Sequence, residues 1–134
     1  MKRSRLAYLL LIPVACLLMG ARQIPLVDPA PIAVPAGLTV KAVSSAIRTG
    51  VSRHGWIVNK DDAGKIEVTL NIRKHITRVT IAYDKANVKV AYAGSENLLY
   101  EEKNGQRFIH RNYQNWLNNL VSDISSALQA AAAK

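Results

Sequence analysis

Apolar residues along this chain change from helical spacing to strict alternation near residue 56, and this change is the strongest constraint on the fold. A short strand at residues 56–58, ended by a turn at residues 61–64, precedes three longer alternating segments between Lys65 and Tyr92. The side chains predicted to face the core on those three segments are Ile66, Val68, Leu70, Ile72, Val79, Ile81, Tyr83, Val88, Val90 and Tyr92. Alternation of this kind buries one side of each strand, which is typical of an antiparallel meander.

Helical spacing is found on both sides of the alternating region. Thr39 is the predicted N-cap of a first helix that runs to about His54 and stops at Gly55. Residues 94–106 are predicted to be irregular, and a final long helix is expected to begin near Phe108. The apolar stripes of the two helices are Val40, Val43, Ile47 and Val51 in the first, and Ile109, Tyr113, Trp116, Leu117, Leu120, Ile124 and Leu128 in the second.

The expected fold is therefore α+β, in the order α-β-β-β-β-α. A four-stranded antiparallel meander with two helices on one face is a two-layer sandwich, which buries every apolar stripe described above. We assign this single domain to residues 38–130, a length that supports one modest core.

The first 21 residues have the form of an export segment. Residues 1–5 are basic, and residues 6–20 are apolar apart from Pro13. A positive start followed by an apolar stretch of this length is typical of a secretory signal, and it is short for a membrane span of about 20 residues. We therefore expect an exported protein of the bacterial cell envelope, located in the periplasm.

The sequence leaves three outcomes open for this segment: lipidation at Cys16, cleavage to a soluble form, or retention as an uncleaved anchor. Cys16 follows a small residue, as in a lipoprotein signal, but Pro13 stands where such signals have leucine. Residues 18–21 have better spacing, yet Ala21 replaces the cysteine. Because Cys16 is the only cysteine of the chain, no intramolecular disulfide can form.

Residues 22–37 are predicted to be a proline-rich tether between the export segment and the domain. Four of the five prolines of the chain lie between Ile24 and Gly37. Proline fixes its own φ and biases the preceding residue toward extended geometry. The apolar residues of the same stretch leave a second interpretation open, which is a strand-like arm packed along the domain.

The net charge of +9 favours anionic partners. Four cations are predicted on the outer face of the sheet, beside a single acid, Glu67; they are Lys65, Arg73, Arg78 and Lys89. This face is a candidate surface for lipid headgroups or an anionic polymer, although a plain solvated face is equally compatible. We expect no nucleic-acid partner, because the face has no aromatic residues between its cations.

No constellation in the sequence indicates catalysis, a cofactor or a metal. The three histidines, His54, His75 and His110, are 21 and 35 residues apart, whereas metal sites usually contain close ligand pairs. Nucleophile turns and phosphate loops are missing from the sequence. The adjacent carboxylates at residues 61–62 and 101–102 are interpreted as turn residues.

A second candidate site lies where the loop before the last helix joins that helix. Asn97, Tyr100, His110 and Tyr113 are expected at one end of the sheet, because the loop leads directly into the helix. Polar side chains with aromatic bodies suit a small ligand-binding cleft. The alternative is that Asn97 satisfies backbone groups of the loop and Tyr100 packs at the edge of the core.

Several short motifs recur together in one known group of proteins. They are Val-Pro-Ala-Gly at residues 34–37, Gly55-Trp56, Tyr83-Asp84, Ser-x-Asn-Leu-x-Tyr at residues 95–100, and Ile-His-x-x-Tyr-x-x-Trp at residues 109–116. This set, over residues 18–125, resembles a family of small uncharacterised proteobacterial lipoproteins. The resemblance implies a location and a fold but no activity. Ala21 stands where such proteins have the lipidated cysteine, so the resemblance leaves membrane anchoring open.

The sequence thus favours a non-enzymatic binding or accessory module for an envelope protein or an anionic envelope polymer. The alternative is a small ligand-binding protein or enzyme that uses the end of the sheet with Asn97, Tyr100, His110 and Tyr113. Membrane contact through the N-terminus is compatible with both, and the oligomeric state is left open.

Overall fold

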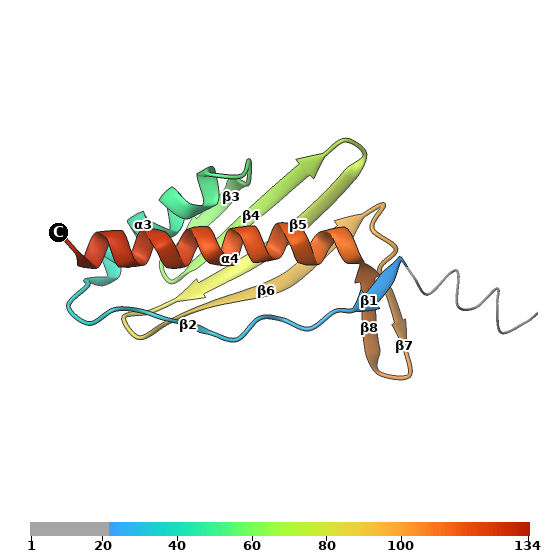
Figure 1. Cartoon of the computed structure of the whole chain (residues 1–134), viewed down its shortest axis with the longest axis horizontal. Coiled ribbons are helices and arrows are strands. Elements are labelled where there is room, and N and C mark those ends of the chain that lie inside the picture. Colours follow the sequence, from blue (N-terminus) through green and yellow to red (C-terminus); the bar gives the residue numbers. More distant parts are fainter. Residues whose placement is uncertain (1–21) are drawn as a thin grey trace, which may run out of the picture.

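The computed structural model describes residues 22–134, which form two antiparallel sheets and two helices (Figure 1). The five-stranded sheet has the order β2-β6-β5-β4-β3, and the three-stranded sheet has the order β1-β8-β7. The strands of the larger sheet are β2 (Ile32–Ala33), β3 (Ile57–Asp62), β4 (Lys65–Ile72), β5 (His75–Tyr83) and β6 (Asn87–Glu96). The remaining elements are β1 (Gln23–Pro25), β7 (Glu101–Lys103), β8 (Gln106–His110), α3 (Val40–Ser52) and α4 (Arg111–Ala132).

The α+β class and the two helices are confirmed, and β3 to β6 form the expected meander. The number of strands is wrong, because β2 adds a fifth strand to the edge of β6, and β1, β7 and β8 form a second sheet. The inward side of β4, β5 and β6 packs against α3 and α4 in one core. In Figure 1, α4 runs across one face of the five-stranded sheet with α3 beside it.

The prediction of an irregular stretch over residues 94–106 is wrong. Strand β6 continues to Glu96, and β7 and β8 form a hairpin around Asn104 and Gly105. Both turn residues have a positive φ, 52° and 79° respectively, and Asn-Gly is the dipeptide that two-residue hairpin turns prefer. The last helix begins at Arg111 rather than near Phe108, because residues 108–110 pair with β1.

The tether interpretation of residues 22–37 is also wrong, and the alternative of a strand-like arm describes this segment. Strand β1 pairs with β8, and β2 pairs with β6. Between them, Leu26 is buried, and its N–H donates to the carbonyl of Arg107 at 2.8 Å. Proline lacks an N–H donor and is tolerated at sheet edges, which is where Pro25 lies. The burial of Leu26 and the pairing of β1 and β2 thus hold the arm against the domain.

The two helices lie in close contact at Gly50 of α3. A Cβ atom added at this glycine would lie 2.8 Å from both the Cα and the N of Ile124 in α4. The helix is capped as predicted, since Thr39 Oγ1 accepts a hydrogen bond from the N–H of Ala42 at 3.1 Å. Beyond the end of α3, His54 pairs with Asp123 of α4. The close contact between α3 and α4 thus depends on a residue without a side chain.

We expect Gly50→Ala to lower the free energy of unfolding by about 1–3 kcal/mol, because overpacking at the crossing outweighs the helix propensity that alanine gains, about 1 kcal/mol. Urea unfolding followed by circular dichroism measures this change. Gly94→Ala in β6 is the matched control, since its Cβ would meet only the Arg78 side chain at 3.8 Å. Equal stability of the two variants would contradict the close helix contact.

Candidate functional site

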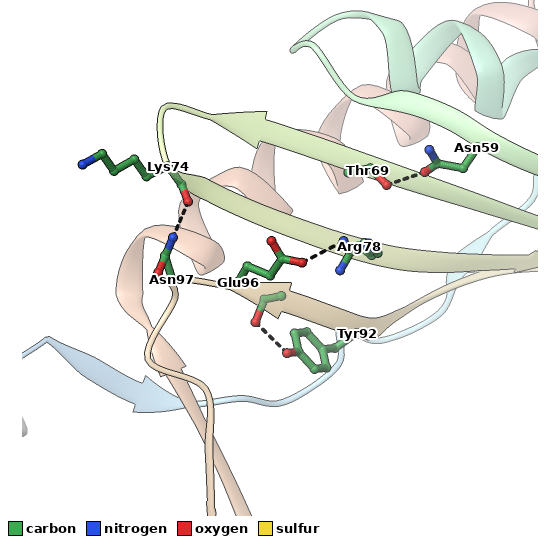
Figure 2. Close-up of polar contacts among 8 residues, drawn as sticks. Asn59, Thr69, Lys74, Arg78, Tyr92, Glu96 and Asn97 are labelled. Atoms are coloured by element: carbon green, nitrogen blue, oxygen red, sulfur yellow. Dashed lines mark hydrogen bonds and ion pairs between the residues drawn. The ribbon is translucent and has the colours of Figure 1, made fainter.

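Asn97 joins the loop after β6 to the turn between β4 and β5 (Figure 2). Its side-chain Nδ2 donates a hydrogen bond to the carbonyl of Lys74 at 2.8 Å. Its own carbonyl accepts from Nδ1 of His75 at 2.6 Å. The backbone of Asn97 is left-handed, with a φ of 57°, a conformation that asparagine tolerates better than most residues. These contacts fit the alternative in which Asn97 satisfies backbone groups of the loop.

His110 is the N-cap of α4. Its Nδ1 accepts a hydrogen bond from the N–H of Asn112 at 3.0 Å, so the ring acts here as a neutral acceptor. Its backbone N–H donates to the carbonyl of Leu98 at 2.7 Å. The pKa of His110 is lowered, first by partial burial and then by the nearby positive charges of its neighbours. The neighbours that contribute are His75, Arg111 and Arg22.

Three tyrosines stack beside this loop. The ring of Tyr100 lies parallel to that of Tyr92, with centroids 4.8 Å apart, and Tyr92 meets Tyr113 edge-on at 5.7 Å. The hydroxyl of Tyr100 donates to Glu102 at 2.8 Å. The hydroxyl of Tyr92 shares a hydrogen bond of 2.7 Å with Ser95, drawn in Figure 2. Tyr92 therefore connects the two tyrosines that the sequence singled out.

Tyr113 occupies the innermost position of this stack, with 1% of its surface exposed. Its hydroxyl has no hydrogen-bond partner within residues 22–134. Burial raises the pKa of Tyr113 well above its ordinary value, and the negative charge of Asp28 raises it further. A neutral phenol in an apolar position acts as a packing group and is not accessible from outside.

The four predicted residues thus lie in two groups at the junction of the two sheets. Tyr100 and Tyr113 meet through Tyr92. Asn97 binds the ring of His75, which lies 6.4 Å from the ring of His110. The sequence does not indicate Tyr92 or His75 as part of this site, because the alternation places Tyr92 in the core and His75 belongs to another strand.

The four cations predicted on the outer sheet face are not gathered into one patch. Lys65 and Lys89 both face Ala82 at one end of the sheet. Arg73 lies in the turn after β4, eight residues from Lys65, which corresponds to roughly 26 Å of strand. Arg78 lies between these ends and pairs with Glu96 at 3.3 Å (Figure 2).

Acidic side chains separate these cations. The outward residues paired across β3, β4 and β5 include Asp62 opposite Lys65, and Lys60 opposite Glu67. At the centre of the face is a shallow depression of about 360 Å³. Its lining includes Asn59, Glu67, Thr69, Arg78 and Ala93, and the side chains of Asn59 and Thr69 are hydrogen-bonded (Figure 2). The face therefore carries both signs of charge around small side chains.

Within residues 22–134, no three His, Cys, Asp or Glu side chains converge in a way that would hold a metal ion. The same part of the chain contains no helix that is long and apolar enough to cross a bilayer. The lipidation candidate Cys16 lies outside the described residues.

Searches of protein-family models, of curated proteins and of solved structures found no match for this chain. The resemblance to small proteobacterial lipoproteins therefore rests on the sequence motifs alone.

The capping role of His110 leads to a test in which two substitutions behave differently. We expect His110→Ala to lower the free energy of unfolding by about 1 kcal/mol, because the first turn of α4 loses its acceptor, whereas His110→Asn retains a cap. Urea unfolding near neutral pH measures both variants. If His110→Ala has the same free energy of unfolding as the wild type, the capping role is contradicted. That result would favour the alternative in which His110 binds a ligand.

The wild type and His110→Asn are also expected to differ in how the free energy of unfolding depends on pH. Because the pKa of His110 is lower in the folded chain than its ordinary value of 6.5, the unfolded chain binds this proton more readily. The stability that neutral His110 contributes is therefore present above about pH 6.5 and is lost as the pH falls toward the folded pKa. The wild type should lose more stability over this range than His110→Asn does.

Tyr113→Phe removes a buried hydroxyl that has no hydrogen-bond partner in the described part of the chain, so we expect the free energy of unfolding to rise by about 1 kcal/mol. Tyr92→Phe is the matched control, because it breaks the bond to Ser95 and should cost about 0.5–1 kcal/mol. Thermal unfolding of the two variants compares them directly. A loss of stability in Tyr113→Phe would show that the hydroxyl has a partner and would favour a ligand site.

Proposed function

We propose that this chain is a non-enzymatic accessory module of the bacterial cell envelope, which docks a partner protein through the outer face of the five-stranded sheet. The observation that carries the proposal is the asymmetry of that sheet. One face is covered by α3 and α4, whereas no element within residues 22–134 covers the other (Figure 1).

The chemistry of the outer face favours a protein over an anionic polymer. Small side chains form its centre, where Thr80 lies between Glu67 and Ala91. Charges of both signs surround them, with Asp62, Glu67 and Glu96 placed among the cations, so the face offers a polyanion no continuous positive surface. A protein surface with its own mixed charges can match this pattern by electrostatic complementarity, which sets register and specificity.

The alternative of a small enzyme or ligand-binding protein has less support. At the end of the sheet with Asn97, Tyr100, His110 and Tyr113, three of the four side chains already have roles in the fold. Asn97 holds a turn, His110 caps α4, and Tyr113 is buried. Tyr100 is exposed, as Asn97 is, and it stacks on Tyr92.

The envelope location is part of the same proposal. Its support is the basic and apolar character of residues 1–21 in the sequence, together with the resemblance of several short motifs to those of small proteobacterial lipoproteins. Attachment to a membrane through this N-terminal segment is compatible with docking through the sheet, because the outer face is built from β3 to β6.

Photocrosslinking in intact cells tests the docking face. A photoreactive residue at Ala91 should give one discrete adduct with an envelope protein, whereas the same residue at the exposed Asn119 of α4 should not. Thr80→Arg places a large cation beside Ala91 and should abolish the adduct, with folding checked by thermal unfolding. An adduct that persists in Thr80→Arg, or that forms equally at Asn119, would overturn the proposal.

A further inference from the structure

Four segments that are distant in sequence meet at the end of the molecule where the described chain begins. The N–H of Arg111, at the start of α4, donates to the carbonyl of Arg22 at 3.0 Å. The side chain of Gln23 donates to the carbonyl of Leu99 at 2.8 Å. The loop that contains Leu99 is bound in turn to the β4–β5 turn through Asn97 and Lys74. Figure 1 shows these segments at the same end of the fold, where the first strand starts.

This end is strongly positive. Four exposed cations belong to it: Arg22, Arg73, Lys74 and Arg111. None of them takes part in an ion pair within residues 22–134. Of the acids next to the loop, Glu96 pairs with Arg78 and Glu101 pairs with Lys103, whereas Glu102 accepts a hydrogen bond from the hydroxyl of Tyr100. In Figure 2 the side chain of Lys74 extends away from the loop.

An exposed leucine lies among these cations. Leu99 has 49% of its surface exposed, and its backbone is left-handed with a φ of 55°. A left-handed conformation costs a residue with a side chain on the order of 1–3 kcal/mol, so it persists only where neighbouring contacts impose it. Here they are the bond from Gln23 to the Leu99 carbonyl and the bond from His110 to Leu98, which is itself buried. The fold therefore holds an apolar side chain outward at a strained position.

The apolar N-terminal stretch of the sequence joins the molecule at this same end. Residues 6–20 are apolar apart from Pro13, and Gly20 is only two residues before Arg22. Two residues span at most about 7 Å of extended chain. Any association of residues 6–20 with a bilayer therefore brings Arg22 and its neighbours to the membrane surface.

We propose that this end, a basic cap formed by Arg22, Arg73, Lys74, Leu99 and Arg111, docks on the surface of a bilayer that contains anionic phospholipid. The cations contact phosphate-bearing headgroups, and Leu99 enters the interfacial region. Clustered basic residues beside an apolar anchor gain affinity from the negative surface potential of such bilayers, and one apolar anchor alone holds a protein only weakly. The inference goes beyond the proposed function, because it uses a different surface and a different partner.

The test uses the full chain with Cys16→Ser, reconstituted into vesicles and labelled with a fluorophore at Leu99→Cys. Vesicles of phosphatidylcholine alone are compared with vesicles of phosphatidylcholine and phosphatidylglycerol, both with a quencher attached to the lipid. We expect clearly stronger quenching at position 99 when phosphatidylglycerol is present. A label at the exposed Gln129, near the far end of α4, is expected to stay unquenched.

Charge reversal then distinguishes the contribution of the basic cap to bilayer binding from that of the apolar residues 6–20. Arg73→Glu, Lys74→Glu and Arg111→Glu together should reduce quenching to the level seen without phosphatidylglycerol, because each lost cation alone lowers the docked population by about fivefold. The matched control is Lys65→Glu, Lys85→Glu and Lys89→Glu, which changes the charge equally at the other end of the sheet and should leave quenching intact. Thermal unfolding checks that both triple variants fold.

A second measurement does not depend on any charge reversal. With the labelled chain that retains all its cations, raising the salt concentration should release position 99 from the bilayer, because screening weakens exposed charges. Quenching that is equal in the two kinds of vesicle, insensitive to salt, or equal at Gln129 would overturn the proposal. The crosslink at Ala91 reports on the outer sheet face separately, so failure of one proposal is distinguishable from failure of the other.

Discussion

The pairing of β1 with β8 determines how the start of the described chain meets the start of α4. Three residue pairs join Gln23, Ile24 and Pro25 to the strand that leads directly into α4. This ladder fixes His110 at the end of β8, where its ring caps the helix, and it places Gln23 beside the carbonyl of Leu99. A small second sheet thus links the arm, the loop after β6 and the last helix. Without it, the cations and the exposed leucine would belong to independent segments.

The sequence predicted the fold correctly where strict alternation of apolar and polar residues allowed only one side of a strand to be buried. The inward residues of β4 to β6, such as Ile66, Val79 and Val88, are buried, because a register shift of one residue would expose the whole set. The same rule predicted Lys65, Arg78 and Lys89 as outward strand residues, and their side chains are exposed, whereas Arg73 lies in the turn after β4. It did not give their separation along the strands, nor the acids on neighbouring strands, and these two features decide whether a charged patch forms.

The missed elements share a physical cause, which is that their partners lie far away in sequence. Residues 101–107 have no apolar alternation, so only the Asn104-Gly105 dipeptide indicated a hairpin. Ile109 shares helical spacing with Tyr113, yet it belongs to β8, because pairing with Ile24 of β1 fixes its backbone. At the candidate site, the proximity of these residues was predicted from the loop that leads directly into the last helix. The contacts that define their roles come from Tyr92 and His75 on other strands.

The length of α4 has a consequence for how far such a molecule would extend from a membrane. Its 22 residues span about 33 Å, and it begins at the same end as the basic cap. In a chain attached to a bilayer by that end, the C-terminal end of α4 would lie up to this distance from the bilayer surface. The outer sheet face would then extend away from the bilayer along the side of the molecule. A partner bound to this face would lie within about 3 nm of the bilayer surface.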